Sequence, residues 1–479
     1  MSEKKPKYIT TTLPYVNADP HIGFGLEIVQ ADTLARYYRL MGEEVFFTTG
    51  TDEHGQKIAQ KADEAGRDRQ EYVDHFAGEF NRLKDALNLS YDTFIRTTDA
   101  NHIAAAQEMW KRCDAAGDIY KKKYKGLYCV GDEMFVKESD LVNGKCPNHP
   151  TQDPIEVEEE NYFFKLSNYQ EYLEEYLSQE GVIEPEWRRQ EALKFVQGGL
   201  EDFSISREVS RMDWGIPVPG DDAHVMYVWF DALTNYISTT GWPEENGNFT
   251  KFWEEGETLQ LGGKDQVRFQ SIMWQAMLKS AGVAATDKVF YHGFINSGGQ
   301  KMSKSLGNVI SPYELVEKYG TDATRYILLR HVHPFDDSDL TWEKMDEYYT
   351  ANLVNGLGNL TARIMKMAET HLDGPIERPE TAGFDTAYTD AFDTCNFQAA
   401  CDFVWQKVGA LDEKITETEP FRLVKTDKEA AVQIIKELVH DLYMVGRMLN
   451  PIMPEANVII KEAVLANKKP DNLFARLET

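Results

Sequence analysis

Two short segments carry residue types that can bind and activate a polyphosphate. The first, His21-Ile22-Gly23-Phe24, follows a β-branched run and opens a helical pattern. A helix start offers free amide N–H groups and the positive end of the helix dipole, so anions bind there. Gly23 lets the backbone approach a ligand closely, and His21 can donate a hydrogen bond to a phosphate oxygen. Because His and Gly are also ordinary residues at a helix start, this segment alone is a weak signal.

The second segment, Lys301-Met302-Ser303-Lys304-Ser305, is a stronger signal. It follows Ser297-Gly298-Gly299, which predicts a glycine hinge. Two lysines on such a loop can move onto a polyphosphate and neutralise the charge that grows in a transition state. The alternative is an exposed basic loop without a ligand, but a fixed pentapeptide is expected by chance in about one of several thousand chains of this length.

The elements around the first segment predict a parallel sheet. Lys7 to Leu13 reads as a buried strand, residues 22–40 carry apolar side chains at helical spacing until Gly42, and Val45 to Thr49 reads as a second strand. A strand, a helix and a strand within about 40 residues require a right-handed parallel crossover, and ligands of such sheets bind beyond the carboxyl ends of the strands. Further parallel strands are expected at His224–Phe230, Thr258–Leu261 and Lys288–His292.

Two other regions follow different patterns. Residues 118–215 show short strands, charged turns and a hairpin from Cys129 to His149, which predicts an insertion. From about residue 345 onward we find no strand signal but apolar residues at helical spacing, namely Leu353, Leu357, Leu360, Ile364 and Met367. The predicted fold is therefore α/β, with a doubly wound parallel-sheet (Rossmann-type) catalytic domain, a connective insertion and a following all-α helical bundle.

The predicted domain boundaries follow these pattern changes. The catalytic domain takes residues 1–117 as its first half and 216–298 as its second half, with the insertion at 118–215 between them. A linker that carries the lysine-rich loop spans 299–345, and the helical bundle spans 346–479.

Composition limits the class of protein. With 42% hydrophobic and 27% charged residues the chain is a globular enzyme, and it holds neither an apolar run that could cross a bilayer nor the apolar core of a signal peptide. Five cysteines, an odd number, argue against a secreted disulfide framework, so we expect a cytoplasmic protein.

The net charge of −28 opposes nucleic-acid binding at long range. A local lysine cluster can still act within a screening length of about 8–10 Å, although its alternative is a solvated surface loop. This cluster consists of Lys121, Lys122, Lys123 and Lys125.

The two phosphate-binding segments resemble the two signature motifs of class I aminoacyl-tRNA synthetases. Within that class, six further segments are similar in order and spacing to methionyl-tRNA synthetases, and the resemblance covers nearly the whole chain. Related leucine, isoleucine and valine enzymes carry a much larger editing insertion, for which 479 residues leave no room. The six segments are Leu13–Tyr15, Thr49–Gly55, Asn161–Phe164, Trp214–Pro217, Tyr227–Ala232 and Gly263–Asp265.

The resemblance implies a methionine–tRNA ligase that activates L-methionine with ATP and Mg²⁺ and transfers it to the 3′ end of tRNA(Met), initiator and elongator. It also implies a monomer without a membrane partner, because the chain ends soon after the bundle. Catalytic roles fall on His21, Lys301 and Lys304, and ATP binding falls on these three together with Gly23, Lys264 and Asp265.

The same resemblance assigns the two other substrates. Asp52 holds the α-ammonium group of methionine through a charge-assisted bond of about 1.5–3 kcal/mol. The anticodon of the tRNA is read by Asn359, Arg363 and Phe421. Asn355, Asn359 and Arg363 recur every four residues, so they are expected on one helix face. Without the resemblance, Asp52 fits an Asx turn and the aromatic residues fit a hydrophobic core. The methionine pocket is lined by Leu13, Tyr15, Trp229, Ala232, Tyr236 and Gln270.

Four positions depart from the family pattern. Phe24 stands where a second signature His is usual, and the loss of one transition-state donor costs about 3–4 kcal/mol. His54 and His292 are the candidate substitutes for that donor. Gln270 replaces a His near the methionine side chain, and Phe421 replaces a Trp that stacks on a base.

The hairpin carries the remaining departure, which concerns metal. Its candidate ligands are Cys129, Asp132, Cys146 and His149, so one thiolate of the family's zinc knuckle has become a carboxylate. Structural zinc sites prefer Cys and His ligands, and a carboxylate is a harder, weaker ligand in such a site. We therefore expect no structural zinc, or weakly bound zinc.

Two rival functions stay open at this stage. A nucleotidyltransferase of the same superfold would use both phosphate segments, but a helical domain of about 130 residues has no role in such an enzyme. A catalytically silent tRNA-binding or regulatory protein fits Phe24, whereas Asp52, Lys301 and Lys304 favour an active enzyme. Pyrophosphate exchange measured with every amino acid separates these functions.

Overall fold

The computed structural model describes residues 4–129, 134–136, 138–147, 153–244, 247–302, 308–379 and 383–477. The chain forms two compact units that interleave along the sequence. Unit 1 comprises Met1–Asp19, Val45–Arg82 and Tyr91–Tyr291, and unit 2 comprises Pro20–Glu44, Leu83–Ser90 and His292–Thr479. The domain boundaries expected from the sequence stay predictions. No helix in the described ranges is long and apolar enough to cross a membrane.

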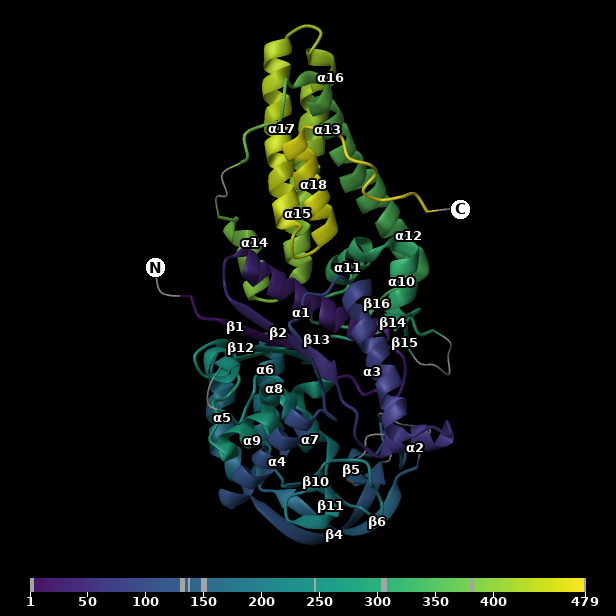
Figure 1. Cartoon of the computed structure of the whole chain (residues 1–479), viewed down its shortest axis with the longest axis vertical. Coiled ribbons are helices and arrows are strands. Elements are labelled where there is room, and N and C mark those ends of the chain that lie inside the picture. The colour runs from purple at the N-terminus through teal and green to yellow at the C-terminus, as the bar shows by residue number, and fades with distance from the viewer. Residues whose placement is uncertain are drawn as a thin grey trace. The chain divides into compact units, whose positions relative to one another are not determined.

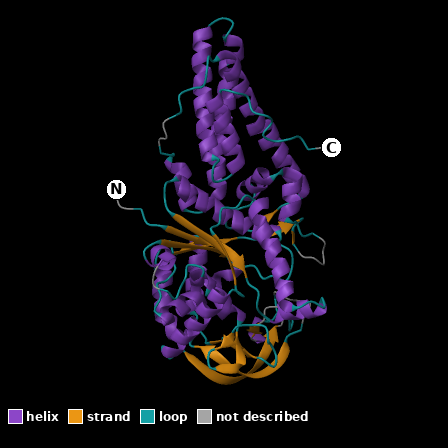
Figure 2. Cartoon of the chain, viewed as in Figure 1, coloured by secondary structure: helices purple, strands orange, loops and turns teal. Residues whose placement is uncertain are grey.

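A six-stranded sheet forms the centre of unit 1, in the order β3-β2-β1-β12-β13-β7. β1 pairs parallel with β2 on one side and with β12 on the other, so strand order reverses at β1 and the predicted doubly wound sheet is confirmed. Figure 2 shows these twisted strands in orange. The strands are β1 (Lys7–Thr10), β2 (Val45–Thr51), β3 (Thr93–Arg96), β7 (Ile183–Glu184), β12 (Glu257–Gly263) and β13 (Lys288–His292).

Helices of unit 1 pack around a core rich in aromatic side chains. The ring of Trp110 meets the ring of Phe230 edge to face at 5.4 Å, and Trp274 is fully buried. Trp110, Phe230 and Trp274 all belong to one continuous apolar cluster. The helices are α2 (Gln56–Glu64), α3 (Arg69–Ala86), α4 (Ala100–Ala115), α5 (Gln170–Ser178), α6 (Glu186–Gln197), α7 (Val228–Leu233), α8 (Asn235–Ser238) and α9 (Trp274–Ala281), with π-helical turns at Phe249–Glu254 and Phe269–Met273 and 3₁₀ turns at Glu138–Asp140, Leu166–Tyr169 and Lys264–Gln266.

Two small antiparallel sheets include the region predicted as an insertion, but β10 and β11 lie beyond its predicted end at residue 215. One has the order β5-β4-β6-β8 and the other β10-β11-β9, and Figure 1 shows their longer strands β4, β6 and β11 close together. The parallel strand expected at His224–Phe230 is wrong, because β11 ends at Met226 and α7 begins at Val228. A short apolar run is compatible with either element, and here it spans both. The strands are β4 (Ile119–Cys129), β5 (Met134–Val136), β6 (Ile155–Phe164), β8 (Phe203–Ser204), β9 (Ser206–Glu208), β10 (Pro217–Val218) and β11 (Asp221–Met226).

The lysine cluster lies on strand β4, not in a surface loop. β4 pairs with the acidic strand β6 along most of its length. Lys121 Nζ lies 2.9 Å from Asp221 Oδ2, and Lys125 Nζ lies 2.5 Å from Glu156 Oε1. Carboxylates of the same region therefore offset part of the cluster's positive charge, which weakens it as a binding site for a phosphate backbone.

Unit 2 is mainly helical. α13, α15 and α17 run side by side in its bundle (Figure 1), with α18 packed against α17. The apolar residues expected to face the core, such as Leu353 and Ile364, are buried. The elements are α1 (Ile22–Leu40), α10 (Pro312–Tyr319), α11 (Thr321–Arg330), α12 (Trp342–Tyr348), a π-helix (Tyr349–Gly358), α13 (Asn359–His371), α14 (Thr386–Asp393), α15 (Phe397–Thr418), α16 (Pro420–Leu423), α17 (Lys428–Met448), α18 (Pro454–Ala466) and the short strands β14 (Ile295–Ser297), β15 (Gln300–Lys301) and β16 (Ser338–Asp339).

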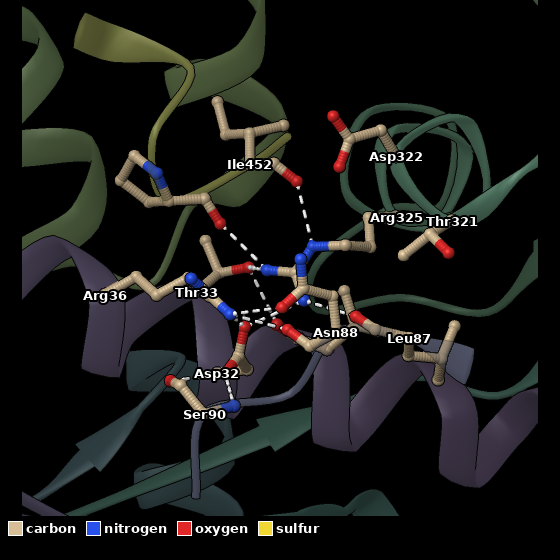
Figure 3. Close-up of polar contacts among 12 residues, drawn as sticks. Asp32, Thr33, Arg36, Leu87, Asn88, Ser90, Thr321, Asp322, Arg325 and Ile452 are labelled. Atoms are coloured by element: carbon tan, nitrogen blue, oxygen red, sulfur yellow. Dashed lines mark hydrogen bonds and ion pairs between the residues drawn. The ribbon is translucent and has the colours of Figure 1, made fainter. Parts of the chain in front are cut away.

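A fully buried ion pair joins α1 to α11 inside unit 2. Arg325 Nη1 lies 2.7 Å from Asp32 Oδ2, and neither side chain is exposed to solvent (Figure 3). Burial alone would raise the pKa of Asp32, but Arg325, Arg36 and a hydrogen bond from Ser90 outweigh it and hold that pKa below its usual value. The guanidinium group of Arg325 also donates to the backbone carbonyls of Leu87, Pro451 and Ile452.

Candidate active site

Three neighbouring strands end at the residues that were predicted to bind substrates. Leu13 and Tyr15 follow β1, Asp52 follows β2, and Lys264 and Asp265 follow β12. Since β2, β1 and β12 are adjacent and parallel, their carboxyl ends meet at one edge of the sheet, beside the point where strand order reverses. This is where open α/β sheets bind ligands.

Tyr15 and Asp52 lie side by side at this edge. They form an isolated parallel β-bridge. The amide N–H of Asp52 donates to the carbonyl of Pro14 at 3.0 Å, and the amide of Val16 donates to the carbonyl of Asp52 at 3.2 Å. The backbone thus fixes the position of Asp52, whose side chain is buried, next to that of the partly buried Tyr15.

Glu53 holds the chain that follows Asp52, a role that was not predicted. Its side chain is completely buried and accepts two hydrogen bonds from Arg96, at 2.6 and 2.8 Å. The hydroxyl groups of Thr51 and Thr98 donate to the same carboxylate. A bidentate guanidinium and two hydroxyls satisfy a buried carboxylate well. They therefore anchor the loop that directly follows Asp52 at the end of β2.

A second group of predicted methionine-site residues gathers around Gln270. Gln270 Nε2 donates to Tyr236 Oη at 2.8 Å and to the carbonyl of Leu261 at 3.2 Å. A Cβ atom at Gly262 would lie only 2.4 Å from Gln270 Oε1, so glycine at this position makes room for the amide. Trp229 stacks on Phe269 with ring centroids 3.7 Å apart.

Asp231 connects these two groups within unit 1. It lies on α7 between Trp229 and Ala232, and its Oδ2 is 2.7 Å from His54 Nδ1, two residues beyond Asp52. Its other oxygen is 2.8 Å from His102 Nε2. Burial would raise the pKa of Asp231, but the two imidazoles reverse the effect and lower it.

The phosphate segments both belong to unit 2. His21 is the exposed N-cap of α1, and its Nδ1 accepts a hydrogen bond from the amide of Gly23 at 3.0 Å, as a helix cap should. Phe24 is buried, and its side chain has no group that can donate a hydrogen bond to a phosphate. Lys301 ends β15, and Lys304 lies outside the described residues, as does the side chain of Lys301.

His292, one of the two candidate substitutes for the missing signature donor, lies in unit 2. Its Nδ1 lies 2.7 Å from the carbonyl of Gly293 and its Nε2 lies 3.0 Å from Glu27 Oε2, so both ring nitrogens are engaged inside unit 2. His54 has its Nδ1 engaged by Asp231 in unit 1. Whether its other nitrogen serves a phosphate stays a prediction.

Comparison with known proteins identifies the family. A family model described as tRNA synthetases class I (M) matches residues 7–154 and 150–365. Methionine–tRNA ligases of Thermotoga maritima and Mycobacterium bovis are each 40% identical to the chain, over 97% and 94% of its length and over 76% and 90% of their own. The chain belongs to the methionine–tRNA ligase family.

A solved structure of the ligase family supports the same assignment at the level of the fold. The Mycobacterium tuberculosis methionyl-tRNA synthetase in complex with methionyl-adenylate superposes with a TM-score of 0.88, at 36% sequence identity, and the match covers 99% of each chain. The doubly wound sheet and the helical region of this chain are therefore those of a class I methionine–tRNA ligase.

In this ligase the residues predicted to read an anticodon lie on unit 2. Asn359 begins α13 and is exposed, and Arg363 follows one turn later, where its guanidinium group pairs with Asp412 of α15. Phe421 on α16 is 44% exposed, and the guanidinium group of Arg422 lies over its ring at 5.7 Å from the centroid. Asn355 departs from the expected α-helical repeat, because it lies in the π-helix that precedes α13.

The hairpin of this ligase is only partly described. Cys129 and Cys146 are both buried, whereas Asp132 and His149 lie outside the described residues. Among the residues that are described, no three His, Cys, Asp or Glu side chains are arranged to hold a metal ion.

Proposed function

We propose that the chain activates L-methionine with ATP and transfers it to the 3′ end of tRNA(Met), both initiator and elongator. A carboxylate oxygen of methionine attacks the α-phosphorus of ATP, and the bond to pyrophosphate breaks. A hydroxyl group of the terminal ribose then attacks the carbonyl carbon of methionyl-adenylate, and AMP leaves. The observation that carries the proposal is the pairing of Tyr15 with Asp52 at the edge where three strands end, in a member of the ligase family.

Methionine is held at both of its ends in this proposal. The Asp52 carboxylate accepts hydrogen bonds from the α-ammonium group, and burial strengthens that charged contact. Aromatic rings suit the thioether, because sulfur gains from contacts with ring edges. The pocket is formed by Leu13, Tyr15, Trp229, Ala232, Tyr236 and Gln270.

ATP is bound through the two signature segments and the start of the helical stretch after β12. His21, Lys301 and Lys304 stabilise charge on the phosphates, and Gly23 lets the α1 amides approach them. Lys264 and Asp265 contact the nucleotide. Mg²⁺ accompanies ATP, whose phosphate oxygens are good ligands for it.

The helical bundle reads the anticodon. Asn359 and Arg363 supply polar groups for base edges, and Phe421 stacks on an unpaired base. Asp412 competes with the RNA for the Arg363 guanidinium group. We propose that this competition disfavours unspecific RNA, because a base edge must replace the carboxylate.

Pyrophosphate exchange tests the proposal. Purified protein is incubated with ATP, labelled pyrophosphate and each of the twenty amino acids in turn, and charging of initiator and elongator tRNA(Met) is then measured. Exchange with methionine alone, followed by charging of both tRNAs, is the expected result. Exchange without an amino acid would indicate a nucleotidyltransferase, and no exchange at all would indicate a silent tRNA-binding protein.

Asp52→Asn is expected to raise the KM for methionine about ten- to hundredfold, because a charge-assisted bond of about 1.5–3 kcal/mol is lost. Asparagine keeps the size and the backbone bonds, so the KM for ATP should stay unchanged. Steady-state exchange with varied methionine and varied ATP measures both constants. Asp213→Asn, at an exposed carboxylate of the same unit, is the control. An equal rise in both KM values would mean that Asp52 supports the fold instead.

Arg363→Ala is expected to lower the kcat/KM for tRNA charging about tenfold, the effect of one lost contact to a base. Its pair with Asp412 is partly exposed, so the loss of stability should stay within about 1 kcal/mol. Methionine-dependent exchange should not change, and Lys366→Ala on the same helix should change neither reaction. A parallel loss of exchange and charging would show that Arg363 maintains the fold.

The finer expectations about metal, assembly and location stay predictions. We propose that the protein is a cytoplasmic monomer and that its hairpin binds no zinc, or binds it weakly, because a carboxylate replaces one thiolate. Elemental analysis of protein purified without chelator measures the metal. About one zinc per chain would contradict the prediction.

A further inference from the structure

Helix α1 contacts residues that precede the second signature in the sequence and residues that follow it. Before that signature, His292 bonds to Glu27 of α1 with a distance of 3.0 Å between Nε2 and Oε2. Beyond it, the amide of Ile22 donates to the carbonyl of Ile310 at 2.9 Å. A Cβ atom at Gly25 would come within 3.2 Å of Pro312 Cγ, so glycine there allows close packing. All of these contacts lie within unit 2.

The contact between His292 and Glu27 has a defined proton count. A carbonyl oxygen only accepts hydrogen bonds, so the bond to Gly293 requires a proton on Nδ1 of His292. A proton must then also lie between Nε2 and Glu27, carried by one or the other. In either arrangement the pair of His292 and Glu27 is neutral as a whole, and each ring nitrogen of His292 has a defined hydrogen-bond partner. Such a bond resists rotation of the imidazole and fixes His292 against α1 within unit 2.

This contact is close to the first signature. Glu27 lies one helical turn after Phe24, and residues three apart share a helix face. Phe24 and Glu27 are both buried, so that face of α1 is packed, while His21 at the N-cap is exposed. With phenylalanine in place of a second imidazole, His21 is the single imidazole of this segment, and its placement depends on how α1 is held.

We propose that Glu27 and His292 are positioning residues for the adenylation step. They fix the position of the first signature, which lies at the start of α1, relative to His292. The segment that leads to the second signature begins at this residue. Neither group touches a phosphate in this proposal. The inference rests on the proposed function, because it assigns the two residues to the activation of methionine.

Substitution of Glu27 separates positioning from general packing. Glu27→Gln keeps a partner for His292, because its amide N–H can donate to the unprotonated Nε2, whereas Glu27→Ala removes the partner. We expect Glu27→Ala to lower the kcat of methionine-dependent exchange about ten- to hundredfold, since a misplacement of about 1 Å costs up to that much. Glu27→Gln should retain at least about a third of the wild-type kcat, with the KM for methionine unchanged in both variants. Equal kcat values for the two variants would overturn the proposal.

A matched control exists in unit 1. His224 is also buried between a carboxylate and a carbonyl, with Nδ1 3.0 Å from Asp221 Oδ2 and Nε2 2.7 Å from the carbonyl of Glu160. His224→Gln and His292→Gln should therefore cost similar stability in thermal melts. Only His292→Gln should lower kcat, by about tenfold or more. The proposal is overturned if the two variants lower kcat equally, or if His292→Gln leaves kcat unchanged. If the wild type shows no methionine-dependent exchange, the proposed function itself has failed.

Discussion

Arg325→Met is expected to lower the free energy of unfolding by about 3–5 kcal/mol, because it removes the buried one of the two guanidinium groups that compensate the Asp32 carboxylate and leaves only Arg36. Both side chains are fully buried, so water cannot take over the role of the guanidinium group. Three backbone carbonyls would lose their donors as well. Urea unfolding followed by far-UV circular dichroism, which reports the helix content, measures the loss.

Two further variants test the cause of that loss. Arg422→Met removes an exposed ion pair with Glu419 and should change the free energy of unfolding by less than about 1 kcal/mol. Asp32→Asn combined with Arg325→Met should recover part of the stability, because the buried carboxylate that is left with Arg36 as its one guanidinium partner is gone. A loss for Arg325→Met no larger than that for Arg422→Met would contradict the prediction.

Lys304→Ala is expected to slow adenylate formation by one to three orders of magnitude, about the effect of losing a charge contact that is made in the transition state. The KM for methionine should hardly change, since the lysine acts on the phosphates. Single-turnover formation of methionyl-adenylate separates the chemical step from product release. Lys468→Ala, an exposed lysine after α18, is the matched control and should behave as wild type. An unchanged rate for Lys304→Ala would remove the residue from the proposed mechanism.

The parts of the fold that were predicted correctly are those with strong local patterns. The helix predicted between Ile22 and Leu40 has those bounds, and its stop is marked by Gly42, whose φ of +78° suits glycine. β2, β12 and β13 are buried along almost their whole length, as parallel strands are, so continuous apolar runs reveal them. From these strands the edge that carries Asp52 follows by topology alone.

The connections inside the site could not be predicted in the same way. His54 and Asp231 are 177 residues apart in the sequence, and Glu53 and Arg96 are 43 apart. No periodic pattern links such partners, because only the folded backbone brings them together. The apolar run before Phe230 failed for a related reason: a strand and a helix share it, and a run of that length fits both.

The interleaving of the two units has a consequence for synthesis on the ribosome. Arg325 follows its hydrogen-bond partner Thr33 by 292 residues. At a translation rate of about 5–20 residues per second, α1 waits roughly 15–60 s for the helix that brings Arg325 to Asp32. During that time a helix made for the interior of unit 2 has no partner from that unit's main segment, which begins only at residue 292. The nascent chain therefore exposes α1, with apolar side chains and the Asp32 carboxylate that are buried in the folded protein, to chaperones well before unit 2 can fold.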